Sequence, residues 1–205
     1  MQALQAQIKP HFLYNTLDII KWMVLGGYYT DSVETINELS RYLRMSISKT
    51  TNIVILRDEI ELGKAYVKII QKRFPSKFGF EIDADPDTLD CLLPKFVLQP
   101  ILENSLTHGL LYCDKSDLLL TIRAWISDGT LNIQIEDNGM GMTAETLQLL
   151  KSGSIESKEG YGLKNTRQRL VLFNGSDTEF NVESRFGVGT CVTLGLKAAR
   201  AERRK

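Results

Sequence analysis

The sequence predicts an α+β protein in which an N-terminal helical hairpin precedes a sheet covered by helices. Apolar residues recur at helical spacing up to about residue 50, as in amphipathic helices. Beyond that point short strands alternate with helical stretches, which is typical of a mixed α/β layer. We therefore expect a helical domain at 1–52, an α/β domain at 53–197 and a basic tail at 198–205.

Composition limits the possible classes of protein. The 205 residues are 43% hydrophobic and 24% charged, as in ordinary soluble globular proteins. The 25 Lys and Arg residues balance 25 Asp and Glu residues, so no positive field indicates nucleic acid or an anionic membrane as a partner. No apolar run approaches the roughly 20 residues of a membrane helix. The three cysteines lack the spacing of a disulfide framework or a zinc site, so a cytoplasmic location is expected.

The helical hairpin is predicted from two apolar stripes, at residues 4–24 and 33–47, separated by "GGYYTD". Asp31 or Ser32 can cap the second helix. Two helices joined by a short turn have little core of their own, so we expect two chains to form a dimeric four-helix bundle. The first stripe starts abruptly without a cap, which indicates a missing upstream region or a frayed native start.

The second domain is predicted to begin with a strand at 53–56 and a helix that runs to about Phe74. Asp58 and Glu59 are placed favourably in the first turn of that helix. The next expected elements are a strand at 78–83, a helix at 94–110, strands at 118–127 and 130–137 joined by a "DGT" turn, helices at 143–150 and 163–173, and strands at 178–184 and 189–197.

A proline interrupts the first helical stripe. "QAQIKPHFLYNTL" is amphipathic, yet an interior proline costs about 3 kcal/mol in a helix. Directly after Pro10 stands His11, one of only two histidines in the chain. Either Pro10 distorts the helix by removing an N–H and clashing with the carbonyl of Ala6, which presents His11, or Pro10 is the first residue of a helix that starts there.

Four stretches of the second domain carry the candidate chemistry: "LQPILENSLTHG", "EDNGMGM", "GYGLKNTRQRL" and "GVGTCVTL". In this order they resemble the nucleotide-binding boxes of the GHKL ATPase superfamily, which gyrase, Hsp90, MutL and histidine kinases share. The resemblance implies an α/β-sandwich domain of the GHKL type that binds ATP and Mg²⁺.

The first box is expected on a helix, where Asn104 and His108 share a face because they are four residues apart. An amide oxygen is a hard ligand that suits Mg²⁺. By resemblance, Asn104 is the magnesium ligand and His108 a donor near the phosphates. A polar helix face over solvent is the alternative.

The second and fourth boxes are assigned to adenine. Asp137 can accept a hydrogen bond from an exocyclic amine, while Gly139 and Gly141 let the backbone approach a flat ligand. In the family that amine belongs to adenine, and the Thr190 hydroxyl contacts the same side. The alternatives are a plain Asn-Gly turn and a cross-strand threonine without a ligand.

The third box is assigned to the phosphates. Gly160 and Gly162 are expected to precede a helix whose free N–H groups face an anion. By resemblance, Gly160, Gly162 and Leu163 belong to the ATP site, and residues 142–159 form a lid. Lys164 and Arg167 either assist or are solvated helix charges.

The opening stretch, together with "LRDEIELGKAYVKIIQKRF", resembles the sensor histidine kinases of the YesM and LytS type over residues 4–196. This implies an ATP-dependent protein histidine kinase that phosphorylates His11 and passes the phosphoryl group to an aspartate of a response regulator. It also implies a homodimer and a membrane connection only through a sensor region upstream. The alternative is an ATP-binding dimeric scaffold without histidine phosphorylation.

Three positions complicate this resemblance. Phe12 stands where many histidine kinases have an acidic residue, so no base for His11 is assigned. Pro100 stands where gyrase-like relatives have a water-activating glutamate. Glu103, directly before Asn104, faces another way on the helix. Asn15 lies one turn after His11 and either aligns a water for phosphatase activity or is a polar surface residue.

Overall fold

The computed structural model describes residues 10–47, 52–152 and 158–201. Its described residues form two compact units. One combines residues 10–47 with 61–76, and the other combines 52–60 with the described residues from 77 to 201. The α+β fold class is confirmed. The domain limits at 52 and 197 stay predictions, and residues 61–76 pack with the hairpin.

The helical unit contains α1 (Pro10–Leu25), α2 (Tyr29–Ile47) and the later part of α3 (Leu56–Arg73). The ring of Phe12 packs against Tyr42 and Tyr66, with centroids 5.1 and 5.0 Å apart. Tyr66 lies on α3, so this helix supplies core contacts that a two-helix hairpin lacks. None of the described helices is long and apolar enough to span a membrane.

The turn between α1 and α2 explains where the second helix starts. Gly27 has a φ of 79°, its N–H donates to Val24 O at 3.1 Å, and the Tyr28 N–H donates to Met23 O at 2.8 Å. This pair of bonds is a Schellman motif, which ends α1 and lets α2 begin at Tyr29. The predicted cap at Asp31 or Ser32 was therefore wrong, since both residues lie inside α2.

Pro10 is the first described residue of α1, and Leu4 and Ile8 lie outside the described residues. Both explanations of Pro10 therefore stay open.

The second unit is built on a five-stranded sheet of order β2-β4-β5-β7-β6. Its strands are β2 (Gly79–Ala84), β4 (Leu119–Ser127), β5 (Thr130–Asp137), β6 (Glu179–Arg185) and β7 (Gly189–Lys197). β2 pairs with β4 in parallel, and the other pairs are antiparallel. Asp128 and Gly129 have φ of 50° and 74°, as a type I′ hairpin turn between β4 and β5 requires.

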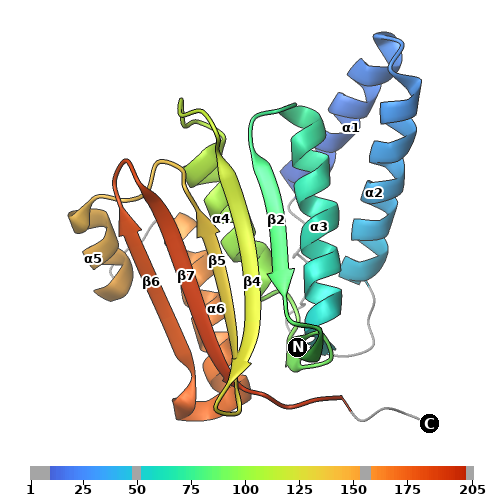
Figure 1. Ribbon diagram of the computed structural model, residues 1–205. Coiled ribbons are helices and arrows are strands. Elements are labelled where there is room, and N and C mark those ends of the chain that lie inside the picture. The colour runs from blue at the N-terminus through green and yellow to red at the C-terminus, as the bar shows by residue number, and fades with distance from the viewer. Residues whose placement is uncertain (1–9, 48–51, 153–157, 202–205) are drawn as a thin grey trace. The chain divides into compact units, whose positions relative to one another are not determined.

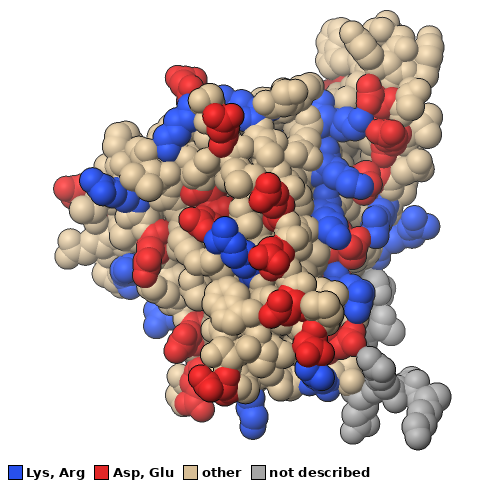
Figure 2. Space-filling view, in the orientation of Figure 1, with Lys and Arg blue, Asp and Glu red and all other residues tan. Residues whose placement is uncertain are grey.

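The two faces of this sheet differ. One face is covered by α4 (Leu98–Asn104) and α6 (Lys158–Asn174), as Figure 1 shows. Leu131, Ile133 and Ile135 alternate along β5 and are buried, so they belong to this covered face. On the opposite face Arg123 pairs with Glu136 at 2.9 Å. Figure 2 shows acidic and basic side chains mixed over that face. The core of this unit therefore lies between the sheet and its helices.

Two helices of the second unit begin away from their predicted starts. The short strand β1 (Ile53–Ile55) pairs with β3 (Leu92–Pro94), so α4 begins at Leu98 and not at Pro94. α5 (Ala144–Ser152) lies close to its predicted place, whereas α6 starts at Lys158, five residues before the expected Leu163. Residues 153–157 of the expected lid lie outside the described residues.

Candidate functional site

A pocket of about 330 Å³ opens in the second unit between α4, α5, α6 and the ends of β5 and β7. This volume lies in the range of small-molecule sites. The predicted residues that line it are Asn104, His108, Asp137, Gly141, Leu163 and Thr190. Residues of all four sequence boxes therefore meet around one cavity.

Asp137 ends β5 and is buried, with 3% of its surface exposed. Its Oδ1 accepts the N–H of Gly139 at 3.1 Å, whereas Oδ2 is buried without a hydrogen-bond partner among the described residues. Burial raises the pKa of this carboxyl, and polar groups of Ser105, Gly139 and Thr190 oppose the increase. A buried acceptor without a donor needs one, and an exocyclic amine fits that need.

The glycines of the second box serve the protein backbone. A Cβ on Gly139 would lie 2.2 Å from the carbonyl oxygen of Gly109, and one on Gly141 would lie 2.1 Å from that of Arg185. Gly141 also has a φ of 64°. Close packing of backbone on backbone thus requires glycine at both positions. Their approach to a flat ligand stays a prediction, and of the two Gly141 lines the pocket.

Asn104 and His108 both line the pocket, although the helix changes form between them. α4 ends at Asn104, and Ser105–Leu110 continue it as a π-helical turn. Such turns are rare and occur often at functional sites. Glu103 is buried and accepts a hydrogen bond from Gln99 at 3.0 Å.

The glycines of the third box lie inside α6 and not before it. Gly160 falls in the first turn, where backbone N–H groups have no intrahelical partner, but Gly162 falls in the second turn. A Cβ on Gly162 would lie 3.7 Å from Pro100 Cβ and 4.0 Å from Asn104 Nδ2. The placement of Gly162 therefore favours helix packing beside Asn104 over phosphate binding by its own N–H.

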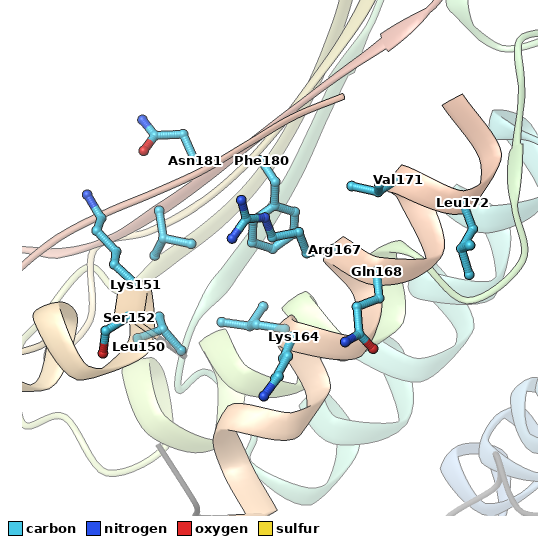
Figure 3. A pocket seen from close by; sticks show the side chains of 12 residues that line it. Leu150, Lys151, Ser152, Lys164, Arg167, Gln168, Val171, Leu172, Phe180 and Asn181 are labelled. Carbon is cyan, nitrogen blue, oxygen red and sulfur yellow. The ribbon is translucent and has the colours of Figure 1, made fainter. Parts of the chain in front are cut away.

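Lys164 and Arg167 line a second groove between α5, α6 and β6, shown in Figure 3. Leu150 and Leu163 border both this groove and the first pocket. The two cations thus stand beside the pocket, and neither lines it.

Thr190 was expected either to contact adenine or to form a cross-strand pair without a ligand, and its position is compatible with both. Its hydroxyl lies 2.9 Å from Ser184 Oγ on the neighbouring strand, as a cross-strand pair does. Its backbone pairs with Asp137, and the residue lines the pocket. The hydroxyl is therefore held in place at the edge of the cavity.

His11 lies in the helical unit with an exposed side chain. The amide Nδ2 of Asn15 lies 3.2 Å from His11 Nδ1 and 3.3 Å from Nε2. The predicted proximity of these two side chains on one helix face is thus observed.

Sequence comparison agrees with this architecture. The family described as "Histidine kinase-, DNA gyrase B-, and HSP90-like ATPase" matches residues 92–200, and the family described as "Histidine kinase" matches residues 1–78. The chain belongs to the sensor histidine kinases. It carries both domains of a two-component histidine kinase core.

One relative is Sensor histidine kinase YesM of Bacillus subtilis, with 33% sequence identity. The alignment covers 96% of this chain and 33% of the length of YesM. Sensor protein LytS of Oceanobacillus iheyensis is 33% identical over 90% of this chain and 32% of its own length. The chain thus spans about a third of these curated relatives.

A solved histidine kinase domain from the blue-light activated histidine kinase of Erythrobacter litoralis shares the fold. Its TM-score is 0.55 at 19% identity, and the alignment covers 93% of this chain and 87% of that one.

Several pocket residues of this histidine kinase core were not predicted from the sequence. They are Ile101, Ser105, Gly109, Phe186 and Val192. Four further lining residues, Met142, Thr143, Thr146 and Leu150, lie in the stretch 142–159 that was expected to form a lid. Ser105 and Gly109 directly follow Asn104 and His108, so adjacency to a motif was the signal that was available. Phe186 lies in the turn before the fourth box, 63% exposed, and no local pattern separates it from other surface aromatic residues.

Proposed function

We propose that this chain is the ATP-dependent catalytic core of a two-component sensor kinase, which transfers a phosphoryl group from ATP to His11 and then to an aspartate of a response regulator. One observation carries the proposal. Asn104, His108, Asp137 and Thr190, which lie in three separate stretches of sequence, line a single pocket of nucleotide size.

Each pocket residue has a distinct role in this proposal. The buried Oδ2 of Asp137 accepts the exocyclic amine of adenine. Asn104 and His108 stand on the α4 side, where the phosphates extend. Within the described ranges no cluster of three acidic, His or Cys side chains forms a metal site, so Mg²⁺ would be held by the Asn104 amide oxygen together with the phosphates, whose charge it neutralises.

The phosphoryl transfer uses an imidazole nitrogen of His11 as the nucleophile. Its lone pair attacks the γ-phosphorus, the N–P bond forms, the bond from that phosphorus to the bridging oxygen breaks, and ADP leaves with the electron pair. The ring proton then passes to solvent. His11 is exposed and therefore accessible to a donor, and Asn15 orients its ring through the adjacent amide.

We infer that the active form is a homodimer. In the helical unit, Tyr14, Leu17 and Val24 on α1 and Val33 and Ile36 on α2 leave at least 44% of their surface exposed. Neighbouring members on one helix are three or seven residues apart, so each helix presents an apolar stripe. A second copy burying these stripes forms the four-helix bundle.

A cytoplasmic position follows from the chemistry of the reaction, since ATP and response regulators are cytoplasmic. In this proposal, attachment to a membrane runs through a sensor region outside this sequence.

Incubation with γ-labelled ATP and Mg²⁺ tests the proposed activity. We expect a label that is stable in base and labile in acid, as a phosphohistidine is, and that maps to the peptide containing His11. Tight ATP binding without any labelled protein would instead identify an ATP-binding dimeric scaffold. Absence of nucleotide binding would refute both functions.

A further inference from the structure

A buried carboxylate outside the pocket holds the start of the helix that carries Asn104. Glu59, in the first turn of α3, is only 2% exposed. Its Oε1 accepts the N–H of Phe96 at 2.7 Å, and its Oε2 accepts those of Val97 and Leu98 at 2.8 and 3.0 Å. The N-cap residue of α4, Val97, has no side chain able to accept these bonds, so Glu59 acts as a remote cap.

Arg169 of α6 holds the other side of the same turn. Its Nη1 donates to the carbonyl oxygens of Lys95 and Phe96 at 2.6 and 3.1 Å. Phe96 has a φ of 61°, a left-handed conformation that is unfavourable for a phenylalanine. Glu59 accepts a hydrogen bond from the Phe96 N–H, and Arg169 donates one to the Phe96 C=O. Both backbone groups of the strained residue are therefore held in place.

The hydrogen bonds in this cluster satisfy both oxygens of the Glu59 carboxyl group. Burial raises the pKa of Glu59 above its usual value, and the three backbone N–H groups and the positive charge of Arg169 oppose this increase. A carboxylate at a helix N-terminus also interacts favourably with the helix dipole. The arrangement thus supplies the partners that a buried carboxylate needs.

This turn contacts the start of α4 and an interior residue of α6, and other parts of both helices line the pocket. Asn104 stands seven residues after Val97 on α4, or about 10 Å along the axis, and Leu163 stands six residues before Arg169 on α6, or about 9 Å. The helices lie side by side between these points, since a Cβ on Gly162 would be 3.7 Å from Pro100 Cβ, an ordinary van der Waals distance. A shift at the turn therefore moves the wall of the pocket that holds Asn104.

We propose that Glu59 is a positioning residue for the nucleotide site: by capping α4 from α3, and together with Arg169, it sets the place of the Asn104 amide relative to the phosphates. This inference rests on the proposed function, because it assumes that Asn104 holds Mg²⁺. The adenine acceptor Asp137 lies on β5, where the ladders with β4 and β7 hold it. We therefore expect Glu59 to affect the metal-dependent part of binding.

The test is Glu59→Gln, measured as ADP affinity by calorimetry with Mg²⁺ and with EDTA. The amide offers one acceptor oxygen in place of two, and its NH₂ faces backbone donors. Loss of a residue that orients a metal ligand typically costs 10-fold to 100-fold, so we expect the Mg²⁺ enhancement of ADP affinity to fall by about 10-fold or more. Affinity in EDTA should stay at the wild-type value.

Asp58→Asn is the matched control. It removes an acidic charge from the same turn of α3, but its side chain is exposed, so its Mg²⁺ enhancement should equal that of wild type. Arg169→Lys is a second variant in case Glu59→Gln does not fold. This variant keeps the positive charge beside Glu59 but loses the planar guanidinium group. We expect it to lower the Mg²⁺ enhancement of ADP affinity by less than Glu59→Gln does.

The outcomes distinguish failure of the positioning role of Glu59 from failure of the proposed nucleotide site. A folded Glu59→Gln or Arg169→Lys protein with wild-type Mg²⁺ enhancement overturns the positioning role. A wild-type protein that does not bind ADP, or binds it without any help from Mg²⁺, overturns the proposed nucleotide site and this inference with it.

Discussion

Replacing Asp137 with asparagine tests adenine recognition with the smallest change in shape. The Gly139 N–H, 3.1 Å from Oδ1, decides how the new amide is oriented. Its oxygen takes the Oδ1 place, because an NH₂ there would face the Gly139 donor. The NH₂ group then occupies the place of Oδ2, the buried atom that has no partner among the described residues. Asp137→Asn therefore presents a donor to the amine of adenine.

The expected cost follows from the hydrogen bond that is lost. A hydrogen bond to a charged group contributes about 1.5 to 3 kcal/mol, which corresponds to a loss of about 10-fold to 100-fold in affinity. Burial already disfavours the charged carboxylate, as its raised pKa shows. The neutral amide should therefore leave the melting temperature unchanged or slightly higher.

Calorimetric titration with ADP and with inosine diphosphate measures this effect. Inosine diphosphate carries a carbonyl oxygen where ADP carries the exocyclic amine, so Asp137→Asn should weaken ADP and not inosine diphosphate. Asp128→Asn, the same exchange in the exposed β4–β5 turn, is the control and should change neither affinity. Unchanged ADP affinity, or equal losses for both ligands, would refute the role of Asp137 in adenine recognition.

Four further outcomes follow from the structure. His11→Gln should abolish labelling by γ-labelled ATP while ADP affinity by calorimetry stays at the wild-type value, and residual labelling near the wild-type rate would reject His11 as acceptor. Asn15→Ala should leave labelling intact but slow dephosphorylation of a cognate regulator; equal rates would make Asn15 a surface residue. Ile36→Glu puts a charge in the apolar stripe of α2 and should shift sedimentation from dimer to monomer. ADP affinity should fall as the pH drops through the raised pKa of Asp137, since protonation turns the acceptor into a donor, and Asp137→Asn should lack this dependence.

Local patterns were enough to predict most elements of the fold. The spacing of apolar residues marked α1, α2 and α3, and alternation marked β4 and β5, because side-chain periodicity along one segment is visible without the rest of the chain. Non-local contacts caused the errors. Pro94 was predicted to begin a helix, but it belongs to β3, which pairs with β1. No local property of residues 92–94 indicates this pairing.

The sequence by itself determined which chemical groups are present, and its four short motifs predicted that these groups meet in one site. Residue type fixes that Asn104 can bind a hard cation and that Asp137 can accept an amine, whatever the fold. Only the tertiary structure decided how these groups are held. The contact of Gly139 with Gly109 and the capping of α4 by Glu59 join segments about 30 to 40 residues apart, and a linear pattern records neither distance nor burial.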